Sequence, residues 1–354
     1  MEKLRIAITI PDGGVRASFI TPQAVNRLSE LGTLFWNPYK RQYTAEELSE
    51  AVNKADICVT GWGSPAFTKE VINKTSTLRM IAHTGGTVAA IISNELYDKG
   101  IKVISGNKLY AESTAEGAVT YMLTALRNLP YYTEKMKSSG WADISEAVNE
   151  GLLDQKVGLV GFGSIAKNAA LLLKAFNTDI YAYDPYVEDE IFASYNVKRV
   201  RTLEELFSNV KIISLHLPLN VENYRLIDAK LLSVMQNGAL FVNTARGACV
   251  DEKALAAELR TGRIKAVLDV FEEEPLPMNS ELRGLDNVML VPHMAGPTYD
   301  RRPLVTMALA DDIERMLTGK PLKHEISYEY GVSMTNEAAV SSLLTGKDLY
   351  IHKS

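Results

Sequence analysis

Residues 156–166 read KVGLVGFGSIA, a short apolar run followed at once by a glycine-rich turn. The run over 157–160 has the length and β-branched character of a buried strand, and residues 164–176 show helical spacing. A strand, the pattern Gly-x-Gly-x-x-Ala and a helix together predict a dinucleotide-binding turn. In such a turn Gly161 makes the tight bend, Gly163 lets the backbone approach a pyrophosphate, and the helix N-terminus faces the phosphates.

An acidic residue supports this interpretation. Asp184 lies 23 residues after Gly161, at the end of the apolar run Ile180–Tyr183. The fold places there the carboxylate that binds the adenosine ribose hydroxyls. Because a carboxylate repels a 2′-phosphate, Asp184 favours NAD over NADP. Two alternatives stay open: Gly61-Trp-Gly63 shows that Gly-x-Gly also arises by chance, and an aspartate before a proline is often only a turn residue.

Short apolar runs alternate with helical stretches along most of the chain, which is typical of βαβ units and a parallel sheet. The length of 354 residues exceeds what one core usually supports. We therefore expect an α/β protein with two Rossmann-like, doubly wound parallel-sheet domains. The first series of strands is predicted over 4–10, 56–60, 78–82 and 101–104, and the second over 157–160, 180–183, 211–217, 239–243, 266–270 and 288–291.

A long amphipathic helix is predicted between the two series, over residues 111–129. Ser113 and Glu116 have the spacing of a capping box at its start, and Pro130 is expected to end it. A last helix is predicted over 304–317, with a polar tail beyond it.

Composition narrows the class of protein. With 46% apolar residues, 38 basic and 43 acidic residues and a net charge of -5, the chain is a globular protein for which nucleic acid or an anionic membrane is a poor partner. The apolar run in residues 1–10 is too short for a signal peptide or a membrane span. Cys58 and Cys249 predict neither a disulfide framework nor a zinc site, and no histidines have metal-ligand spacing, so we expect no metal and a cytoplasmic location.

Polar residues follow the last three predicted strands. Arg246, the acidic run Glu272–Glu274 and His293 each come directly after one of them, and ligands bind beyond the carboxyl ends of parallel strands. An arginine can hold an anionic substrate, a histidine can exchange a proton with its oxygen, and a carboxylate can orient the imidazole. Taken singly, such residues are more often a surface ion-pair partner (Arg246), a solvated turn (Glu272–Glu274) and a buried histidine (His293). Their joint position favours hydride transfer at a carbon that bears oxygen.

The remaining histidines and Cys249 are less informative. We expect His216 and Cys249 to serve packing, His83 to lie at a strand end where it could border a cleft, and His324 to lie on the surface.

Together these residues resemble the D-isomer-specific 2-hydroxyacid dehydrogenases over roughly residues 50–320. The resemblance implies a cofactor domain inserted into the substrate-binding domain: residues 1–111 and 299–330 would bind substrate, 112–298 would bind NAD, and 331–354 would form an extension. It rests on Gly161–Ala166, Asp184, His216-Leu-Pro-Leu, Asn243-Thr-Ala-Arg-Gly247, Asp269-Val-Phe, Glu274-Pro275 and Pro292-His293.

The resemblance also implies roles for individual residues. Arg246 resembles the substrate-binding arginine, Glu274 the carboxylate that supports the histidine, and His293 the catalytic acid/base. Asp269 resembles the residue that holds the nicotinamide carboxamide. The loop of Thr84, Gly85, Gly86 and Thr87 corresponds to the one whose backbone amides receive the substrate carboxylate. The expected cofactor-binding set is Gly161, Phe162, Gly163, Ser164, Ile165, Asp184, Leu217, Pro218, Thr244, Ala245, Arg246, Asp269 and His293.

The sequence departs from the family pattern in two places. Thr87-Val88-Ala89 stands where the family commonly has Gly-Val-Asp, and Met294 follows His293 where isoleucine is usual. The first departure bears on the substrate, because that loop touches it. The expected activity is the NAD-dependent interconversion of a small 2-keto acid and a D-2-hydroxy acid. The alternative is a nicotinamide-dependent binding protein, as in the corepressors that share this fold.

The segment from Tyr131 to Gly151 predicts an interface. It contains Tyr131, Tyr132, Trp141 and Ile144, and is too apolar for a free linker of that length. Family members use the corresponding arm to embrace a second subunit. We therefore expect a twofold homodimer in which Trp141 packs on the partner, the alternative being an arm folded back on its own domain.

Overall fold

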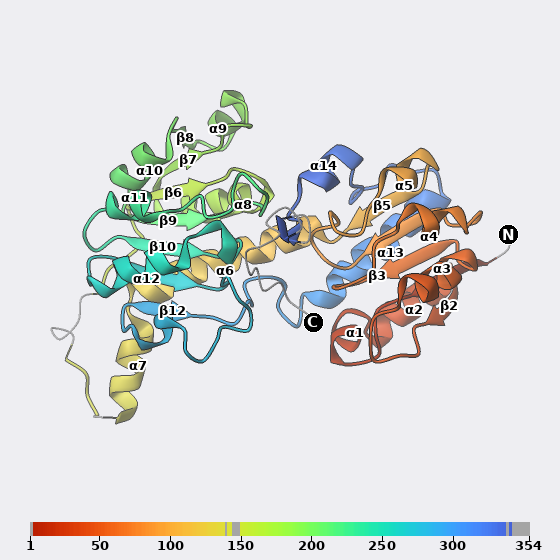
Figure 1. Ribbon diagram of the computed structural model, residues 1–354, viewed down its shortest axis with the longest axis horizontal. Helices are drawn as coiled ribbons and strands as arrows, with labels where there is room; N and C mark the ends of the chain where they lie inside the picture. Colours follow the sequence, from red (N-terminus) through yellow and green to blue (C-terminus); the bar gives the residue numbers. More distant parts are fainter. Residues whose placement is uncertain (1–2, 139, 144–148, 338–339, 342–354) are drawn as a thin grey trace. The chain divides into compact units, whose positions relative to one another are not determined.

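The computed structural model describes residues 3–138, 140–143, 149–337 and 340–341. The chain forms two compact units. Among the described residues, unit 1 combines those before 111 with 297–337, and unit 2 combines those of 111–296 with 340–341. In the sequence, unit 2 is therefore inserted between the two parts of unit 1 (Figure 1).

The core of unit 2 is a parallel sheet of seven strands in the order β12-β11-β10-β9-β6-β7-β8. The order reverses between β6 and β9, and this switch point is where doubly wound sheets bind ligands. The sequence predicted six of these strands and missed β8, which is only two residues long. The strands are β6 Lys156–Val160, β7 Asp179–Tyr183, β8 Lys198–Arg199, β9 Ile212–Leu215, β10 Leu240–Asn243, β11 Lys265–Leu268 and β12 Val288–Leu290.

Helices cover both faces of this sheet (Figure 1). Successive residues of a strand point to opposite faces. Leu240 accordingly packs with α6, α8 and α9, whereas Phe241 packs with α10, α11 and α12. Burial on both faces explains why the strands read as continuous apolar runs. The helices are α6 Asn107–Leu126, α7 Leu129–Ser138, α8 Ser164–Leu173, α9 Asp189–Ser194, α10 Leu203–Asn209, α11 Ala229–Ser233 and α12 Glu252–Arg260, with short 3-10 helices at Lys174–Phe176, Gly247–Cys249 and Glu281–Gly284.

Unit 1 contains a second parallel sheet, of five strands in the order β2-β1-β3-β4-β5. The two sheets confirm the predicted fold class, although β2, which is mostly solvent-exposed, was not predicted. The strands are β1 Leu4–Ile8, β2 Gly32–Trp36, β3 Ile57–Thr60, β4 Met80–His83 and β5 Lys102–Ser105. The helices are α1 Gly14–Phe19, α2 Pro22–Leu31, α3 Ala45–Asn53, α4 Lys69–Asn73, α5 Asn94–Asp98, α13 Arg302–Leu317 and α14 Tyr328–Ser333.

The predicted boundaries of the long helix were wrong. Helix α6 begins at Asn107, so Ser113 lies buried inside it and caps nothing. The break comes at Asn128, whose φ of 53° is left-handed, and not at Pro130. Pro130 is the second residue of α7, a position where proline costs little because the first N–H groups of a helix have no partner inside it.

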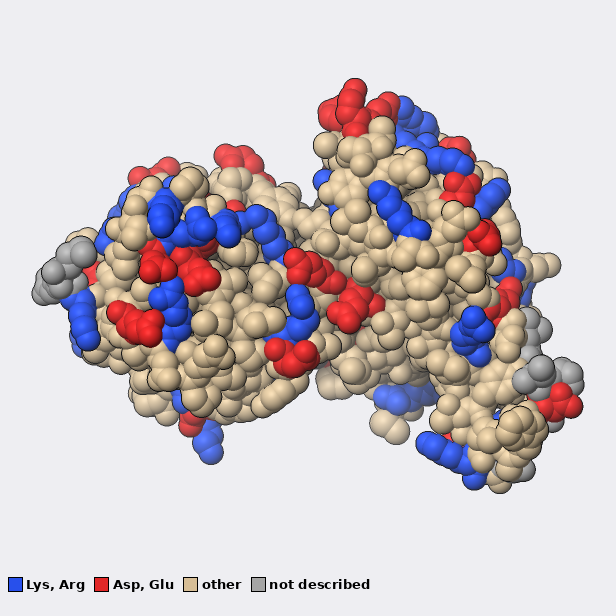
Figure 2. Space-filling model, turned by 180° about the vertical axis from the view of Figure 1, so that it is seen from behind, with Lys and Arg blue, Asp and Glu red and all other residues tan. Residues whose placement is uncertain are grey.

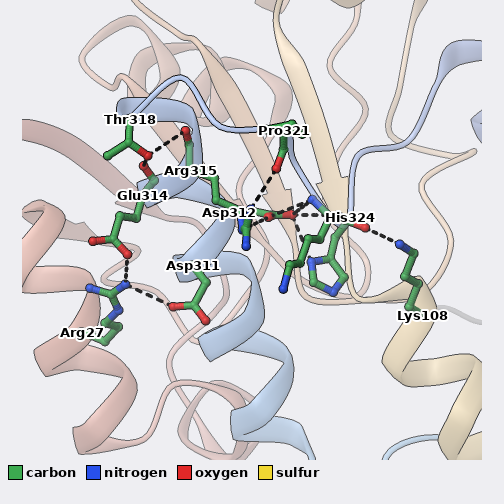
Figure 3. Close-up of polar contacts among 10 residues, drawn as sticks. Arg27, Lys108, Asp311, Asp312, Glu314, Arg315, Thr318, Pro321 and His324 are labelled. Carbon is green, nitrogen blue, oxygen red and sulfur yellow. Dashed lines mark hydrogen bonds and ion pairs between the residues drawn. The ribbon is translucent and has the colours of Figure 1, made fainter.

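Helix α13 returns the chain to unit 1 and closes its core with Val305, Leu309 and Ile313. Its Asp312 is 1% exposed and accepts hydrogen bonds from the backbone N–H groups of Lys323 and His324 and from the His324 ring nitrogen Nδ1. Figure 3 shows this group of side chains. His324 is therefore not the surface residue that we predicted, because its side chain is only 13% exposed.

Over the face seen in Figure 2, acidic and basic side chains alternate. None of the helices in the described part of the chain combines the length and apolar character that a membrane crossing requires. Within the same residues, no group of three or more His, Cys, Asp or Glu side chains is arranged to hold a metal ion.

Candidate active site

A histidine and a glutamate form a close pair at the carboxyl edge of the unit 2 sheet. His293 follows β12 and Glu274 follows the neighbouring strand β11. The His293 Nδ1 lies 2.7 Å from Glu274 Oε2, while Glu274 Oε1 accepts the backbone N–H of Phe271 at 3.0 Å. The Glu274 side chain is 12% exposed and that of His293 is 47% exposed. A fixed carboxylate thus orients an imidazole whose other nitrogen can reach a ligand, which does not fit the alternative of a buried histidine.

The backbone at His293 has an unusual conformation. Its φ is 48°, in the left-handed region, where a side chain other than glycine is strained. The His293 N–H donates to the carbonyl of Asp269 at 2.8 Å. The carboxylate of Asp269 then accepts the N–H groups of Met294 and Ala295 at 2.8 and 3.0 Å. Strain of this kind persists where the surroundings fix it, and it gathers at functional sites.

Asp269 has a further partner that the sequence did not suggest. The hydroxyl of Tyr121, on helix α6, donates to Asp269 Oδ1 at 3.2 Å. Burial, with the charge of Asp269 beside it, raises the pKa of Tyr121, so the hydroxyl keeps its proton. Asp269 is 1% exposed and has three donors, and a carboxylate accepts about four hydrogen bonds, so roughly one acceptor position remains.

Arg246 lies on a tight turn after β10, the next strand of the sheet. The side chain of Asn243 shapes this turn, because it accepts the N–H of Ala245 at 3.0 Å and donates to the carbonyl of Arg246 at 3.1 Å. Gly247 comes next. A Cβ atom there would lie 1.8 Å from the carbonyl carbon of Phe271, so only glycine lets this turn pack on the chain that leads to Glu274.

The glycine turn after β6 has the features that a dinucleotide requires. Gly161 has a φ of 86°, and a Cβ atom on it would lie 2.9 Å from the carbonyl oxygen of His216. The N–H of Phe162 donates to Asp184 Oδ2 at 2.8 Å. Gly163 precedes α8 without a side-chain cap, and a Cβ atom there would meet nothing within 4 Å. A helix N-terminus that has no side-chain cap and lies next to open space fits a pyrophosphate.

Asp184 combines two roles. Its Oδ1 accepts the N–H of Tyr186 at 2.9 Å, which is the turn contact of the alternative interpretation, while its Oδ2 fixes the glycine turn. It lies directly after β7 and is partly exposed. The predicted position at the strand end is therefore confirmed.

The other predicted cofactor residues lie near this edge with different degrees of exposure. Phe162 is fully buried and its ring stacks on Phe192 at 4.7 Å, so only its backbone is available to a ligand. Ser164 is exposed. His216 is buried, which lowers its pKa to about 4 and keeps it neutral. Ile165, Leu217 and Pro218 are partly exposed, and Thr244 and Ala245 are buried.

The predicted substrate loop belongs to unit 1, where it follows β4. Thr84 is held by the carbonyl of Thr60, which accepts both its N–H and its hydroxyl. In the described part of the chain, no group accepts the backbone N–H of Gly85, Gly86 or Thr87. Below the loop, His83 is buried, which lowers its pKa to about 4, and its Nδ1 lies 2.8 Å from the Thr60 hydroxyl.

The seven-stranded parallel sheet and its glycine turn define a dinucleotide-binding protein of the doubly wound class. The sequence model described as the NAD binding domain of D-isomer specific 2-hydroxyacid dehydrogenases matches residues 119–295. A D-3-phosphoglycerate dehydrogenase of Methanocaldococcus jannaschii is 35% identical over 278 residues, which are 78% of this chain and 52% of that protein. A (S)-sulfolactate dehydrogenase of Chromohalobacter salexigens is 32% identical over 250 residues, 70% of this chain and 81% of that protein.

The chain belongs to the family of D-isomer-specific 2-hydroxyacid dehydrogenases. It spans about half the length of the phosphoglycerate dehydrogenase. Among solved structures, an acyclic imino acid reductase in complex with NADPH and D-Arg has a TM-score of 0.75 at 25% identity and covers 92% of this chain and 100% of its own. A D-mandelate dehydrogenase of Rhodotorula graminis has the same fold, with a TM-score of 0.76 at 21% identity, and the match covers 92% of this chain and 98% of its own.

Proposed function

We propose that the chain is an NAD-dependent dehydrogenase that interconverts a small 2-keto acid and a D-2-hydroxy acid. This proposal rests on the His293–Glu274 pair, which lies beside the Arg246 turn at the sheet edge where the glycine turn also lies. The bound nicotinamide would supply or accept the hydride at the reacting carbon. The relatives named for phosphoglycerate and sulfolactate support a hydroxy-acid substrate.

His293 moves the proton in this proposal. During reduction of a keto acid, its protonated ring donates a proton to the carbonyl oxygen, and during oxidation it takes that proton back. Glu274 stabilises the charged ring through Nδ1, because the two lie 2.7 Å apart. The guanidinium of Arg246 stabilises the negative charge that develops on the oxygen.

Unit 1 is the proposed substrate-binding domain and unit 2 the proposed NAD-binding domain. The N–H groups of Gly85, Gly86 and Thr87, for which the described residues offer no acceptor, would receive the carboxylate of the substrate. A panel of 2-keto acids with NADH, followed by absorbance, tests the activity. Binding of NADH without turnover of any keto acid would instead favour a nicotinamide-dependent binding protein.

Asp184 is proposed to select NAD. Replacing Asp184 with alanine should weaken NAD binding by about 10-fold, because the ribose hydroxyls lose a charged acceptor. The difference in affinity between NAD and NADP should also become smaller, because the charge that repels the 2′-phosphate is gone. Steady-state kinetics with both cofactors measure the change. Glu188→Ala, which removes an exposed acid from the same loop, is the control. A native protein that prefers NADPH would contradict this assignment.

We also propose a homodimer. Helix α7 has no buried residue, and Trp141 beyond it is 87% exposed. A large aromatic side chain exposed to this degree is typical of an interface. Ile144, which belongs to the same predicted arm, lies outside the described residues.

Replacing Trp141 with alanine should weaken this dimer, because the partner loses its aromatic contact. Sedimentation at several concentrations should show twice the 39.1 kDa of the chain for the native protein and a shift toward the monomer for the variant. Met278→Ala removes another exposed apolar side chain of unit 2 and should change nothing. A native protein that is monomeric throughout the range would refute the dimer.

Location and other partners stay predictions from composition. Cys58 and Cys249 are both free and buried. They fit the proposed cytoplasmic location, with neither nucleic acid nor a membrane as partner.

A further inference from the structure

Arg302 is a partly buried cation in unit 1 that pairs with no carboxylate in the part of the chain that the structure describes. Its Nε donates to the carbonyl of Pro297 at 3.3 Å and its Nη1 to the hydroxyl of Ser18 at 3.2 Å, and both acceptors are neutral. Among the residues that the structure describes, none forms an ion pair with Arg302. The nearby acid Asp300 is stabilised by the side chain of Thr298, which lowers the pKa of Asp300.

Two aromatic rings hold the guanidinium of Arg302. Its central carbon lies 5.4 Å from the ring centre of Trp62 and 5.7 Å from that of Phe19. These distances are within the range of cation–π attraction. Phe19 is 1% exposed and forms the floor of the cluster, whereas Trp62 is 44% exposed. The rings contact the flat face of the guanidinium, so N–H groups along its edge can still donate to a ligand. Carboxylate, sulfonate and phosphate groups are the acceptors that suit this edge.

This cluster lies beside the loop with the three available N–H groups. Trp62 follows Gly61, and a Cβ atom on Gly61 would lie 3.4 Å from the hydroxyl oxygen of Thr84. The ring of Tyr110 lies 6.5 Å from that of Trp62, and a Cβ atom on Gly86 would lie 3.2 Å from the Tyr110 ring. The loop that would take the substrate carboxylate is therefore continuous, through Tyr110 and Trp62, with Arg302.

We propose that Trp62 and Arg302 form a subsite for a second anionic group at the far end of the substrate. The substrate class is then a 2-keto or D-2-hydroxy acid with two negatively charged ends, one on the N–H groups of Gly85–Thr87 and one on Arg302. This inference rests on the proposed function and adds to it the charge of the substrate's side chain. The apolar carbons between the two ends would lie against Trp62.

Matched pairs of keto acids test the subsite. 2-Ketoglutarate and oxaloacetate carry a second carboxylate, and 2-ketovalerate and 2-ketobutyrate carry a methyl group instead. The native protein should prefer the charged member of each pair in kcat/KM. Arg302→Met should lower kcat/KM for the charged member by about 10- to 100-fold, the usual worth of a charge-assisted hydrogen bond, and leave the uncharged member nearly unchanged.

Two further variants separate recognition from folding. Arg302→Lys keeps the charge and should retain part of the preference. Arg27, on α2, pairs with Asp311 and Glu314 of α13, the helix that also carries Arg302. Arg27→Met removes this other cation and should leave the preference for charged keto acids intact. Equal loss for charged and uncharged keto acids in Arg302→Met would show that Arg302 only supports the fold, and the subsite would be refuted while the proposed function stands.

A binding measurement covers the case in which no keto acid is reduced. In a Trp36→Phe, Trp141→Phe variant, Trp62 is the single tryptophan of the chain. Its fluorescence should respond to succinate, and Arg302→Met should abolish the response. A tryptophan signal that ignores succinate would refute the subsite without reference to activity.

Discussion

His293→Ala should bind NADH almost normally and lose about 10²- to 10⁴-fold in turnover, the usual contribution of a general acid/base. The effect is specific because the imidazole contacts Glu274, whereas the glycine turn is built on β6 and α8 and makes no use of it. Turnover of an accepted keto acid and titration of NADH fluorescence measure the two properties separately.

The left-handed backbone at His293 calls for a second variant. Alanine adopts a φ of 48° less readily than histidine does, so part of the loss in this variant would come from a disturbed turn. Asparagine tolerates this conformation but cannot act as the acid. His293→Asn should therefore keep the stability of the native protein and still lose turnover. Undiminished turnover in both variants would remove His293 from the mechanism.

Gly247→Ala should disrupt the candidate site through packing alone. The added Cβ would lie 1.8 Å from the carbonyl carbon and 2.0 Å from the carbonyl oxygen of Phe271, and neither backbone atom can rotate away. The two segments that carry Arg246 and Glu274 would have to separate. We expect the free energy of unfolding to fall by about 1–3 kcal/mol or more, the cost of overpacking a core, together with most of the activity.

A matched control is available in the same unit. A Cβ at Gly284 would meet nothing within 4 Å, so Gly284→Ala should leave stability and activity near the native values. Denaturant unfolding of the two variants gives the comparison. If Gly247→Ala unfolds like the native protein, the close contact with Phe271 does not position the site.

The sequence predicted the features of the site that depend on local pattern. Gly161 and Asp184 could be found because a glycine turn and a strand-end acid have fixed spacing, and Glu274 and His293 because each follows an apolar strand. Strand β8 could not be found, because two residues carry no periodicity. Helix α6 was placed too late because Ser113 has the spacing of a cap in a region that tertiary packing makes helical.

The contacts that hold His293 in place could not be predicted from the sequence either. Tyr121 occupies an ordinary position in the apolar pattern of a helix, and nothing near it in sequence indicates the contact with Asp269, 148 residues away. The left-handed conformation of His293 likewise depends on hydrogen bonds to Asp269, 24 residues earlier in the chain. Both are long-range consequences of the sheet order and leave no local signal.

The insertion of unit 2 into unit 1 sets an order on biosynthesis. A ribosome releases the chain from its N-terminus, so residues 111–296 emerge before helix α13 does. Until then the first sheet lacks Val305, Leu309 and Ile313 and exposes the apolar face that they cover. The nascent chain therefore has all seven strands of the unit 2 sheet while the five-stranded sheet, although it was begun first, still lacks the helix that covers it. Any delay or cleavage before Arg302 leaves that sheet open to chaperones and to aggregation.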